Sequence, residues 1–295
     1  MQILLTGKNG QVGFELQRAL APLGHIVAVD QFDCDLSNQN ALRRLVREVA
    51  PDIIVNAAAY TAVDKAESDA DKAFAINAVA PGVLGEEAAR LGALVVHYST
   101  DYVFDGAKQT CYTEDDLPNP QSVYGKSKLV GDKALLQSIE ACLIFRTSWV
   151  FGAHGNNFAK TMLKLAVERE SLNIVADQFG APTSAALIAD VTAQIVGRYQ
   201  RQGQMDFPCG LYNLVAGGET SWCDFAKTVI AAAHQAGKPL KLKAENIRPI
   251  TTAEYPLPAS RPANSRLDTR KIRETFGLCL PVWQEGLNHV LQEIL

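Results

Sequence analysis

Short apolar runs alternate with longer segments of helical periodicity along the first half of the chain. One such segment, residues 11–23, carries apolar side chains three or four positions apart, on one helical face: Val12, Leu16, Leu20 and Leu23. The runs between these segments are apolar on both faces, which is typical of strands in a parallel sheet covered by helices on both sides. The strands expected on this basis are residues 2–5, 25–30, 52–56, 93–98 and 142–146.

The expected helices of the first half follow the strands in regular order. They span residues 11–23, 40–49, 65–91 and 123–136. Repeated strand–helix units with short links imply right-handed crossovers between parallel strands. The pattern therefore predicts the α/β fold class, with a doubly wound parallel sheet.

The periodicity is less regular after about residue 150. We expect helices at 157–168, 185–198, 221–235, 269–276 and 283–295, and strands at 172–175 and 211–215. Four prolines between Ile247 and Asn264 predict an ordered irregular loop. The expected domains are a dinucleotide-binding domain over 1–150 and mainly a smaller α/β substrate-binding domain over 151–295. The strand at 172–175 and the helix at 185–198 can also belong to the first.

Composition narrows the function classes. The 295 residues are 47% hydrophobic and 20% charged, which excludes a disordered chain. With 28 Lys+Arg against 32 Asp+Glu and no basic block, nucleic acid and membrane surfaces are not expected partners. No apolar run approaches the roughly 20 residues that span a bilayer, and no leader pattern is visible. We expect a soluble, cytoplasmic protein.

A glycine-rich turn joins the first strand to the first helix. Gly7 would permit the tight turn, Gly10 would let the backbone approach a pyrophosphate, and Gly13 would allow close packing. The free N–H groups of the helix N-terminus favour that anion. Asp30 ends the second strand, where an acidic residue would hold an adenosine ribose. The turn predicts a dinucleotide site in a Rossmann sheet.

Tyr124 and Lys128 lie one turn apart on an expected helix. A tyrosine with its ordinary pKa of about 10 is a poor acid–base catalyst at pH 7. A lysine cation nearby would lower that pKa. Thr100 follows the fourth strand at the carboxyl edge of the sheet, where its hydroxyl can polarise a substrate carbonyl; Ser99 is its neighbour and competitor for this role.

These motifs resemble the extended short-chain dehydrogenase/reductase family. The glycine turn has the family's GxxGxxG spacing, and Tyr124–Lys128 reads YGKSK. Within the family the chain is most similar to reductases of dTDP-linked 4-keto-6-deoxy sugars. The stretches that carry this likeness are Tyr98–Phe104, Phe145–Phe151, Gly155–Phe158, Asp177–Thr183 and Ser260–Ser265.

The resemblance implies the roles of further residues. The catalytic residues would be Thr100, Tyr124 and Lys128. The cofactor contacts would be Gly7, Gly10, Gln11, Val12, Asp30, Asp35, Leu36, Ala59, Tyr60, Thr61, Tyr98, Tyr124 and Lys128. The substrate contacts would be Thr100, Asp101, Trp149, Asn157, Arg261 and Asn264. Two of these have alternative structural roles: Trp149 in the core, and Arg261 in an ion pair that stabilises the Pro-rich loop.

The resemblance leaves the metal open. Some of these reductases bind a divalent ion such as Mg²⁺ through acidic side chains at a dimer interface, and a homodimer is compatible with the resemblance. Glu15 and Glu293 are candidates for two ligands, but Ala186 stands where a third would be expected. We therefore predict no protein metal site.

The activity implied is NADPH- or NADH-dependent reduction of the 4-keto group of dTDP-6-deoxy-L-lyxo-4-hexulose to dTDP-L-rhamnose, for cell-surface polysaccharide. Asp30 disfavours a 2′-phosphate and Lys8 offsets it, so the sequence leaves the choice of cofactor open. One alternative is a nucleotide-sugar 4-epimerase or dehydratase that keeps its NAD bound. Another is a non-catalytic, NAD(P)-binding regulatory subunit.

Overall fold

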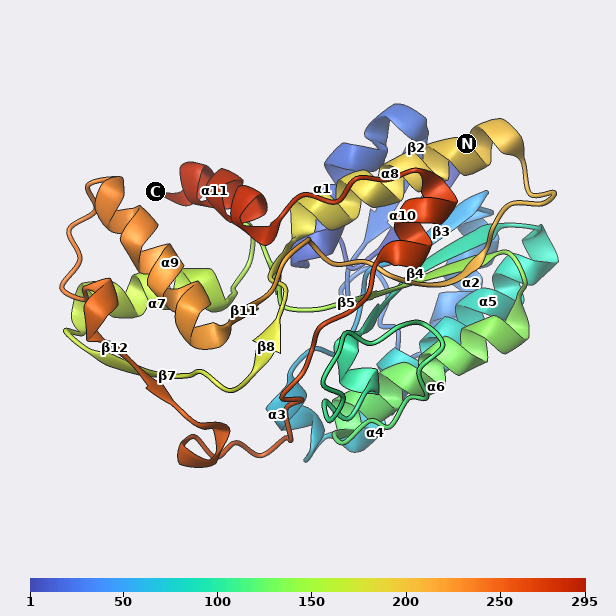
Figure 1. Cartoon of the computed structure of the whole chain (residues 1–295). Coiled ribbons are helices and arrows are strands. Elements are labelled where there is room, and N and C mark those ends of the chain that lie inside the picture. The colour runs from blue at the N-terminus through green and yellow to red at the C-terminus, as the bar shows by residue number, and fades with distance from the viewer.

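A six-stranded parallel sheet forms the centre of the larger domain in the computed structural model, which describes residues 1–295 (Figure 1). The strand order is β10–β5–β4–β3–β1–β2. The strands are β1 (Gln2–Thr6), β2 (His25–Val29), β3 (Ile53–Asn56), β4 (Leu94–Thr100), β5 (Cys142–Thr147) and β10 (Gly210–Asn213). Because β1 has β2 on one side and β3 on the other, the winding reverses after β2. The predicted doubly wound sheet is confirmed.

Helices cover both faces of this sheet. On one face α1 (Gln11–Leu20) packs against α8 (Ala185–Gln202), and on the other α5 (Ala80–Leu91) packs against α2 (Gln39–Val49) and α6 (Val123–Ser138) (Figure 1). The central strands are fully buried, which accounts for their apolar residues on both faces. The sheet therefore holds the chain's largest core.

The segment expected as one helix over residues 65–91 is interrupted. It comprises α3 (Val63–Ala66), α4 (Ala70–Phe74), a π-helical turn (Ala75–Val79) and α5. The Ser68 hydroxyl donates to the Lys65 carbonyl where α3 ends. The side-chain amide of Asn77, in the π turn, accepts from the Tyr60 backbone N–H and donates to the Tyr60 carbonyl. Local side-chain bonds to the backbone thus compete with a continuous helix.

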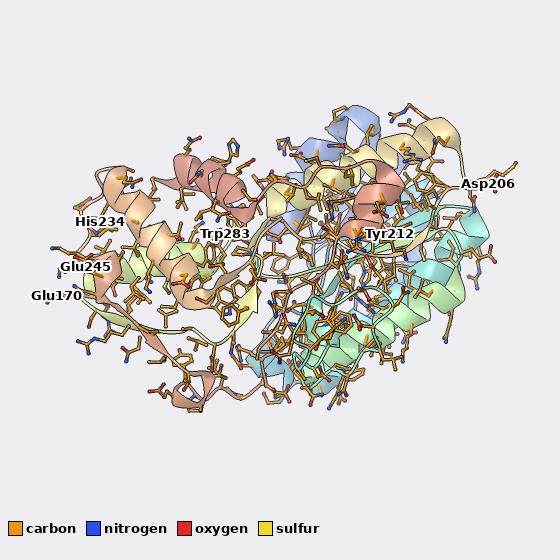
Figure 2. The ribbon with its side chains drawn as sticks, in the orientation of Figure 1. Glu170, Asp206, Tyr212, His234, Glu245 and Trp283 are labelled. Carbon is orange, nitrogen blue, oxygen red and sulfur yellow. The ribbon has the colours of Figure 1, made fainter.

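The smaller domain contains α7 (Phe158–Glu168), α9 (Trp222–Gln235) and α11 (Trp283–Ile294). In Figure 2, Trp283 lies where this domain meets the larger one, and His234 and Glu245 lie toward its far end. Its strand pair joins β7 (Leu172–Val175) to β12 (Ile247–Ile250) in parallel. The strand at 172–175 therefore lies outside the main sheet. The alternative that it belongs to the dinucleotide-binding domain is wrong.

The Pro-rich segment expected as irregular begins with β12. Pro249 has no N–H to donate, and a strand in a two-stranded pair has one open edge where a missing donor is tolerated. The buried Ile247 anchors this strand to the core of the smaller domain. The rest of the segment contains a short 3-10 turn (Thr252–Glu254) and an isolated bridge from Asn264 to Phe179.

The chain returns to the larger domain after residue 150. Strand β10, expected at 211–215, pairs with β5 and forms the edge of the sheet. Helix α8 packs on α1, and α10 (Arg270–Phe276) contacts β10. Two short pairs, β6 (Val150–Phe151) with β9 (Thr183–Ser184) and β8 (Phe179–Gly180) with β11 (Thr220–Ser221), complete the sheets. A boundary at residue 150 is therefore too simple, because later elements complete the sheet and its cover. No helix is long and apolar enough to cross a membrane.

Candidate active site

A cleft of about 680 Å³ runs along the carboxyl ends of the central strands. It is lined by every residue predicted to contact the cofactor except Tyr60. Tyr60 instead has its backbone bonded to Asn77, and its hydroxyl donates to Asp69 at 3.1 Å. The fold thus brings residues from several separate segments of the chain to one cleft, as expected for ligand sites in open α/β sheets.

The glycine turn forms one end of the cleft. Gly7 has a φ of +77°, and a Cβ on Gly13 would lie 2.0 Å from the Gly7 carbonyl oxygen, so the helix packs closely on the turn itself. Gly10 caps α1 without any side-chain hydrogen bond and is exposed in the cleft. The first turn of α1 therefore offers backbone N–H groups to an anion, which fits a pyrophosphate.

Asp30 is held in a small polar cluster beside this turn. Its carboxylate accepts from Asn9 Nδ2 at 2.5 Å and from the Phe32 backbone N–H at 2.8 Å. Lys8 Nζ lies 3.8 Å from Asp30 and 2.6 Å from Asp33. Lys8, the only cation in this cluster, is therefore shared between Asp30 and Asp33, which partly neutralise its charge.

Tyr124 and Lys128 lie in the same cleft. Burial raises the pKa of Tyr124 above its ordinary value, and hydrogen bonding with Thr100 opposes that rise. Lys128 is 1% exposed, and burial lowers the pKa of its ammonium to about 8 while Asp132 raises it. The expected lowering of the pKa of Tyr124 by Lys128 is therefore wrong for this structure, because burial sets the direction of the shift. Tyr124 is kept as a phenol, which is the form that can donate a proton.

Thr100, Asp101 and Trp149 lie outside the lining of this cleft. Thr100 and Asp101 are buried, and one Asp101 carboxyl oxygen, Oδ2, has no hydrogen-bond partner. Burial raises the pKa of Asp101 to about 6. Trp149 has a φ of +49° and stacks on Trp222 with ring centroids 3.7 Å apart. A strained backbone at a partly exposed tryptophan is typical of ligand sites.

The three remaining predicted substrate contacts are engaged within the chain. Asn157 Nδ2 donates to Gln11 Oε1 at 3.0 Å and to the Gly152 carbonyl at 2.7 Å. Arg261 forms a two-pronged ion pair with Asp64 at 3.0 and 2.8 Å. This pair is the alternative role that the sequence left open for Arg261.

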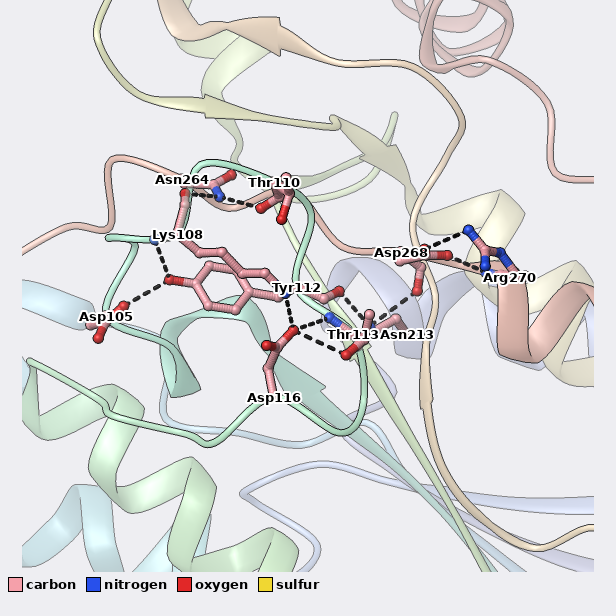
Figure 3. Close-up of polar contacts among 10 residues, drawn as sticks. All are labelled: Asp105, Lys108, Thr110, Tyr112, Thr113, Asp116, Asn213, Asn264, Asp268 and Arg270. Carbon is pink, nitrogen blue, oxygen red and sulfur yellow. Dashed lines mark hydrogen bonds and ion pairs between the residues drawn. The ribbon is translucent and has the colours of Figure 1, made fainter.

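Asn264 holds a long loop in place. Its amide nitrogen donates to the backbone carbonyls of Lys108 at 2.6 Å and Thr110 at 2.8 Å, as Figure 3 shows. Its oxygen accepts from the backbone and side chain of Arg266. Both ends of the amide are therefore used for contacts inside the protein.

Glu15 and Glu293, the two acidic residues considered as metal ligands, do not belong to a cluster of ligating side chains. Glu15 pairs with Arg18 at 3.3 Å, and Glu293 is exposed on α11. No group of three or more His, Cys, Asp or Glu side chains is placed to hold a metal ion.

Comparisons with known proteins assign the family. The family model described as the RmlD substrate binding domain matches residues 1–295. A dTDP-4-dehydrorhamnose reductase of Shigella flexneri is 50% identical over 298 residues, covering 100% of this chain and 98% of that protein. The chain belongs to the dTDP-4-dehydrorhamnose reductase family.

Solved structures of dTDP-4-dehydrorhamnose reductases have the same fold. The one from Clostridium acetobutylicum has a TM-score of 0.90 at 37% identity, covering 99% of each chain. The one from Bacillus anthracis, in complex with NADP, has a TM-score of 0.89 at 35% identity, again covering 99% of each. The similarity thus extends over both domains.

Sequence reasoning missed several residues of the cleft. The polar residues Asn9, Lys72 and Thr147 also line it, as does the apolar Phe32. A second group, Thr6, Asn56 and His97, is buried behind Lys128. Polar residues near the carboxyl ends of otherwise apolar strands were the available indication, because such positions meet at one edge of a parallel sheet.

Proposed function

We propose that the protein reduces the 4-keto group of dTDP-6-deoxy-L-lyxo-4-hexulose to dTDP-L-rhamnose with NADPH or NADH. The observation that carries this proposal is a single cleft, bounded by the glycine turn at Gly10 and by Tyr124 and Lys128. Membership of the dTDP-4-dehydrorhamnose reductase family supports the choice of substrate. The NADP complex of the Bacillus anthracis relative supports the choice of cofactor.

The residues of the cleft have distinct roles in holding the dinucleotide. Gly10, Gln11 and Val12 would face the phosphates at the start of α1, and Asp30 would accept from the adenosine ribose. Lys128 would hold the nicotinamide ribose. When bound, the reduced nicotinamide supplies the hydride.

Proton donation is the task of Tyr124. Burial keeps Tyr124 a phenol at pH 7 but also makes it a weaker acid, so the proton transfer to the sugar O4 depends on the negative charge that develops on that oxygen. Thr100 hydrogen-bonds the carbonyl oxygen and orients it. The Lys128 ammonium favours the phenolate that remains after the transfer.

The sugar nucleotide would meet the protein beside this site. Asp101 offers a buried carboxyl oxygen without a partner, which suits a sugar hydroxyl, and Trp149 offers a partly exposed ring. The polar groups of Asn157, Arg261 and Asn264 are already paired within the chain. We therefore assign these three to shaping the substrate side of the site.

The test is an NADPH-oxidation assay with 4-keto-6-deoxy sugars carried on dTDP, UDP and GDP. We expect one NADPH consumed per dTDP-L-rhamnose formed, with the dTDP sugar preferred. No net NADPH consumption, with NAD already bound to the purified protein, would instead favour a 4-epimerase or dehydratase. A stoichiometric protein partner and no turnover on any sugar would favour a regulatory subunit.

A further inference from the structure

Three buried polar side chains form a row across the carboxyl end of the sheet. Thr6 of β1 is in register with Asn56 of β3, and Asn56 is in register with His97 of β4. The Thr6 hydroxyl donates to Asn56 Oδ1 at 2.6 Å, and Asn56 Nδ2 lies 3.0 Å from His97 Nδ1. Each residue is at most 1% exposed. Side chains in one register row share a face, so the row is continuous.

Lys128 of α6 ends this row. Its Nζ lies 3.0 Å from His97 Nε2 and donates to the Tyr98 carbonyl at 2.6 Å. A buried ammonium is costly unless its hydrogens are accepted. Of the hydrogen-bond partners of Nζ, His97 is the one whose state can change, because it is a donor or an acceptor depending on its tautomer.

The donor and acceptor pattern restricts this tautomer. Burial and the charge of Lys128 hold the pKa of His97 well below its ordinary value, so the ring is neutral. An ammonium only donates, so a charged Lys128 requires an unprotonated Nε2 and a proton on Nδ1. That proton then needs an acceptor, which the Asn56 amide provides only when its oxygen faces the ring in place of the Nδ2 that lies there.

The Asn56 amide allows two complete patterns. With Nδ2 toward His97, the ring accepts at Nδ1 and carries its proton on Nε2, which suits a neutral Lys128 amine. After a half-turn of the amide, its oxygen accepts from Nδ1 and its nitrogen donates to the Thr6 hydroxyl, which suits the ammonium. The first pattern has one proton fewer than the second, so a change from the second pattern to the first releases one proton to water.

We propose that His97 is a positioning residue that holds Lys128 as an ammonium beside Tyr124, with the Asn56 amide turned so that its oxygen faces the ring. This inference rests on the proposed reductase function, in which the lysine cation supports proton donation by Tyr124. The row adds an acceptor for the ammonium that the motif YGKSK does not reveal.

Groups other than His97 also influence the charge of Lys128. Asp132 faces it from α6, where Tyr124 lies one turn earlier, and the Tyr98 carbonyl faces it from β4. Asp132 is itself held by the Ser99 hydroxyl at 2.7 Å and lies 3.7 Å from Arg146 of β5. None of these contacts includes His97, so a change at His97 alone leaves them in place.

The first test reads the tautomer in the wild-type protein. Nitrogen-15 NMR of labelled histidine should show neutral His97 with its proton on Nδ1 at pH 7, changing to Nε2 as the pH rises past the pKa of Lys128, about 8. His97→Gln assigns the resonance. A proton fixed on Nε2 at pH 7, or an imidazolium there, would overturn the proposal. Because this reading needs no turnover, it stands apart from any failure of the proposed activity.

The second test compares two variants by their pH profiles. His97→Leu removes the acceptor, so the alkaline limb of kcat/KM should move down by about one pH unit, which is tenfold lower activity on that limb. The KM for NADPH should rise as well. His97→Gln keeps an acceptor and should restore most of both, and the exposed His25→Gln is the matched control. Folded Leu and Gln variants with wild-type profiles would show that His97 only fills the core.

Discussion

Gly125 of α6 packs directly against the backbone carbonyl of Tyr102. A Cβ on Gly125 would lie 2.2 Å from the Tyr102 oxygen, far inside any contact distance. Tyr102 belongs to the short 3-10 turn (Asp101–Val103) that follows Thr100. The glycine inside YGKSK thus lets the helix that carries Tyr124 approach the strand end that carries Thr100.

Gly125→Ala should therefore damage both stability and activity. The methyl group forces α6 away from the turn, so we expect the free energy of unfolding to fall by about 1–3 kcal/mol. The kcat should fall as well, because Tyr124 is displaced from Thr100. Urea unfolding and steady-state kinetics measure the two effects. Lys126→Ala, at an exposed site on the same helix, is the control and should change stability by no more than about 0.5 kcal/mol.

Much of the fold was predictable because periodicity reflects burial. The central strands are apolar on both faces since helices cover both, and this pattern is visible in the sequence. Pairing between distant segments was not. Neither the joining of β7 to β12 nor the return of β10 to the edge of β5 leaves a local pattern, because each depends on contacts between residues far apart in the chain.

The site was predictable where a residue type is tied to its chemistry. The glycine turn, Asp30, Tyr124 and Lys128 do meet in one cleft. The pKa shifts of the site residues were harder to predict from the sequence, because the depth of burial decides the direction of such a shift. Tyr124 is only partly exposed at the cleft, and the loss of solvent around its hydroxyl raises its pKa despite the nearby lysine. The polar strand ends of Thr6, Asn56 and His97 were visible in the sequence, but their pairing in one row depends on the register of β1, β3 and β4.

A buried glutamate on α5 should make stability depend on acid pH. Glu87 is 1% exposed and bonds Arg43, Arg47 and Arg90 at 2.7–2.8 Å. Hydrogen bonds from Arg47 are the main reason that its pKa falls to about 2. Since the folded pKa lies below the unfolded value, the stabilisation is complete above about pH 4.5 and is lost as the pH falls toward 2.

Glu87→Gln should accordingly lower the free energy of unfolding at pH 7 by about 1–3 kcal/mol. The difference from wild type should shrink between pH 4.5 and the lowest pH at which both proteins fold. Urea titrations across this range measure it. Glu86→Gln, half-exposed and paired with Arg43 alone, is the control and should change stability by less than about 1 kcal/mol. A pH-independent difference at Glu87 would mean that packing, rather than charge, is what the substitution removes.

Asp30→Ala should shift the cofactor preference toward NADPH. Like charges about 4 Å apart near a surface repel by roughly 1–4 kcal/mol, so the NADPH/NADH ratio of kcat/KM should rise about fivefold or more. Lys8 remains paired with Asp33 at 2.6 Å, and that pairing limits the gain. Steady-state kinetics with both cofactors measure the ratio, and the exposed Asp115→Ala is the control. An unchanged ratio would show that Asp30 does not face the ribose.

Tyr124→Phe gives the most direct test of the reaction. The substitution removes one hydroxyl and keeps the ring, so folding and cofactor affinity should survive. Because a general acid contributes about 10²–10⁴-fold, kcat should fall by that order. Lys128→Met should instead weaken both turnover and NADPH binding, since the lysine is expected to carry the ribose contact.

Thr100→Val should mainly reduce kcat, by an amount near the roughly 1–3 kcal/mol of one lost hydrogen bond to a buried partner. Part of its effect will appear as lower stability, because the Thr100 hydroxyl also accepts from the Tyr102 backbone N–H at 3.2 Å. Unfolding measurements on each variant separate the two effects. If Tyr124→Phe keeps turnover within a few-fold of wild type, Tyr124 is not the acid. The Tyr124 phenol would then have no catalytic role, and another group of the cleft would have to supply the proton to the sugar O4.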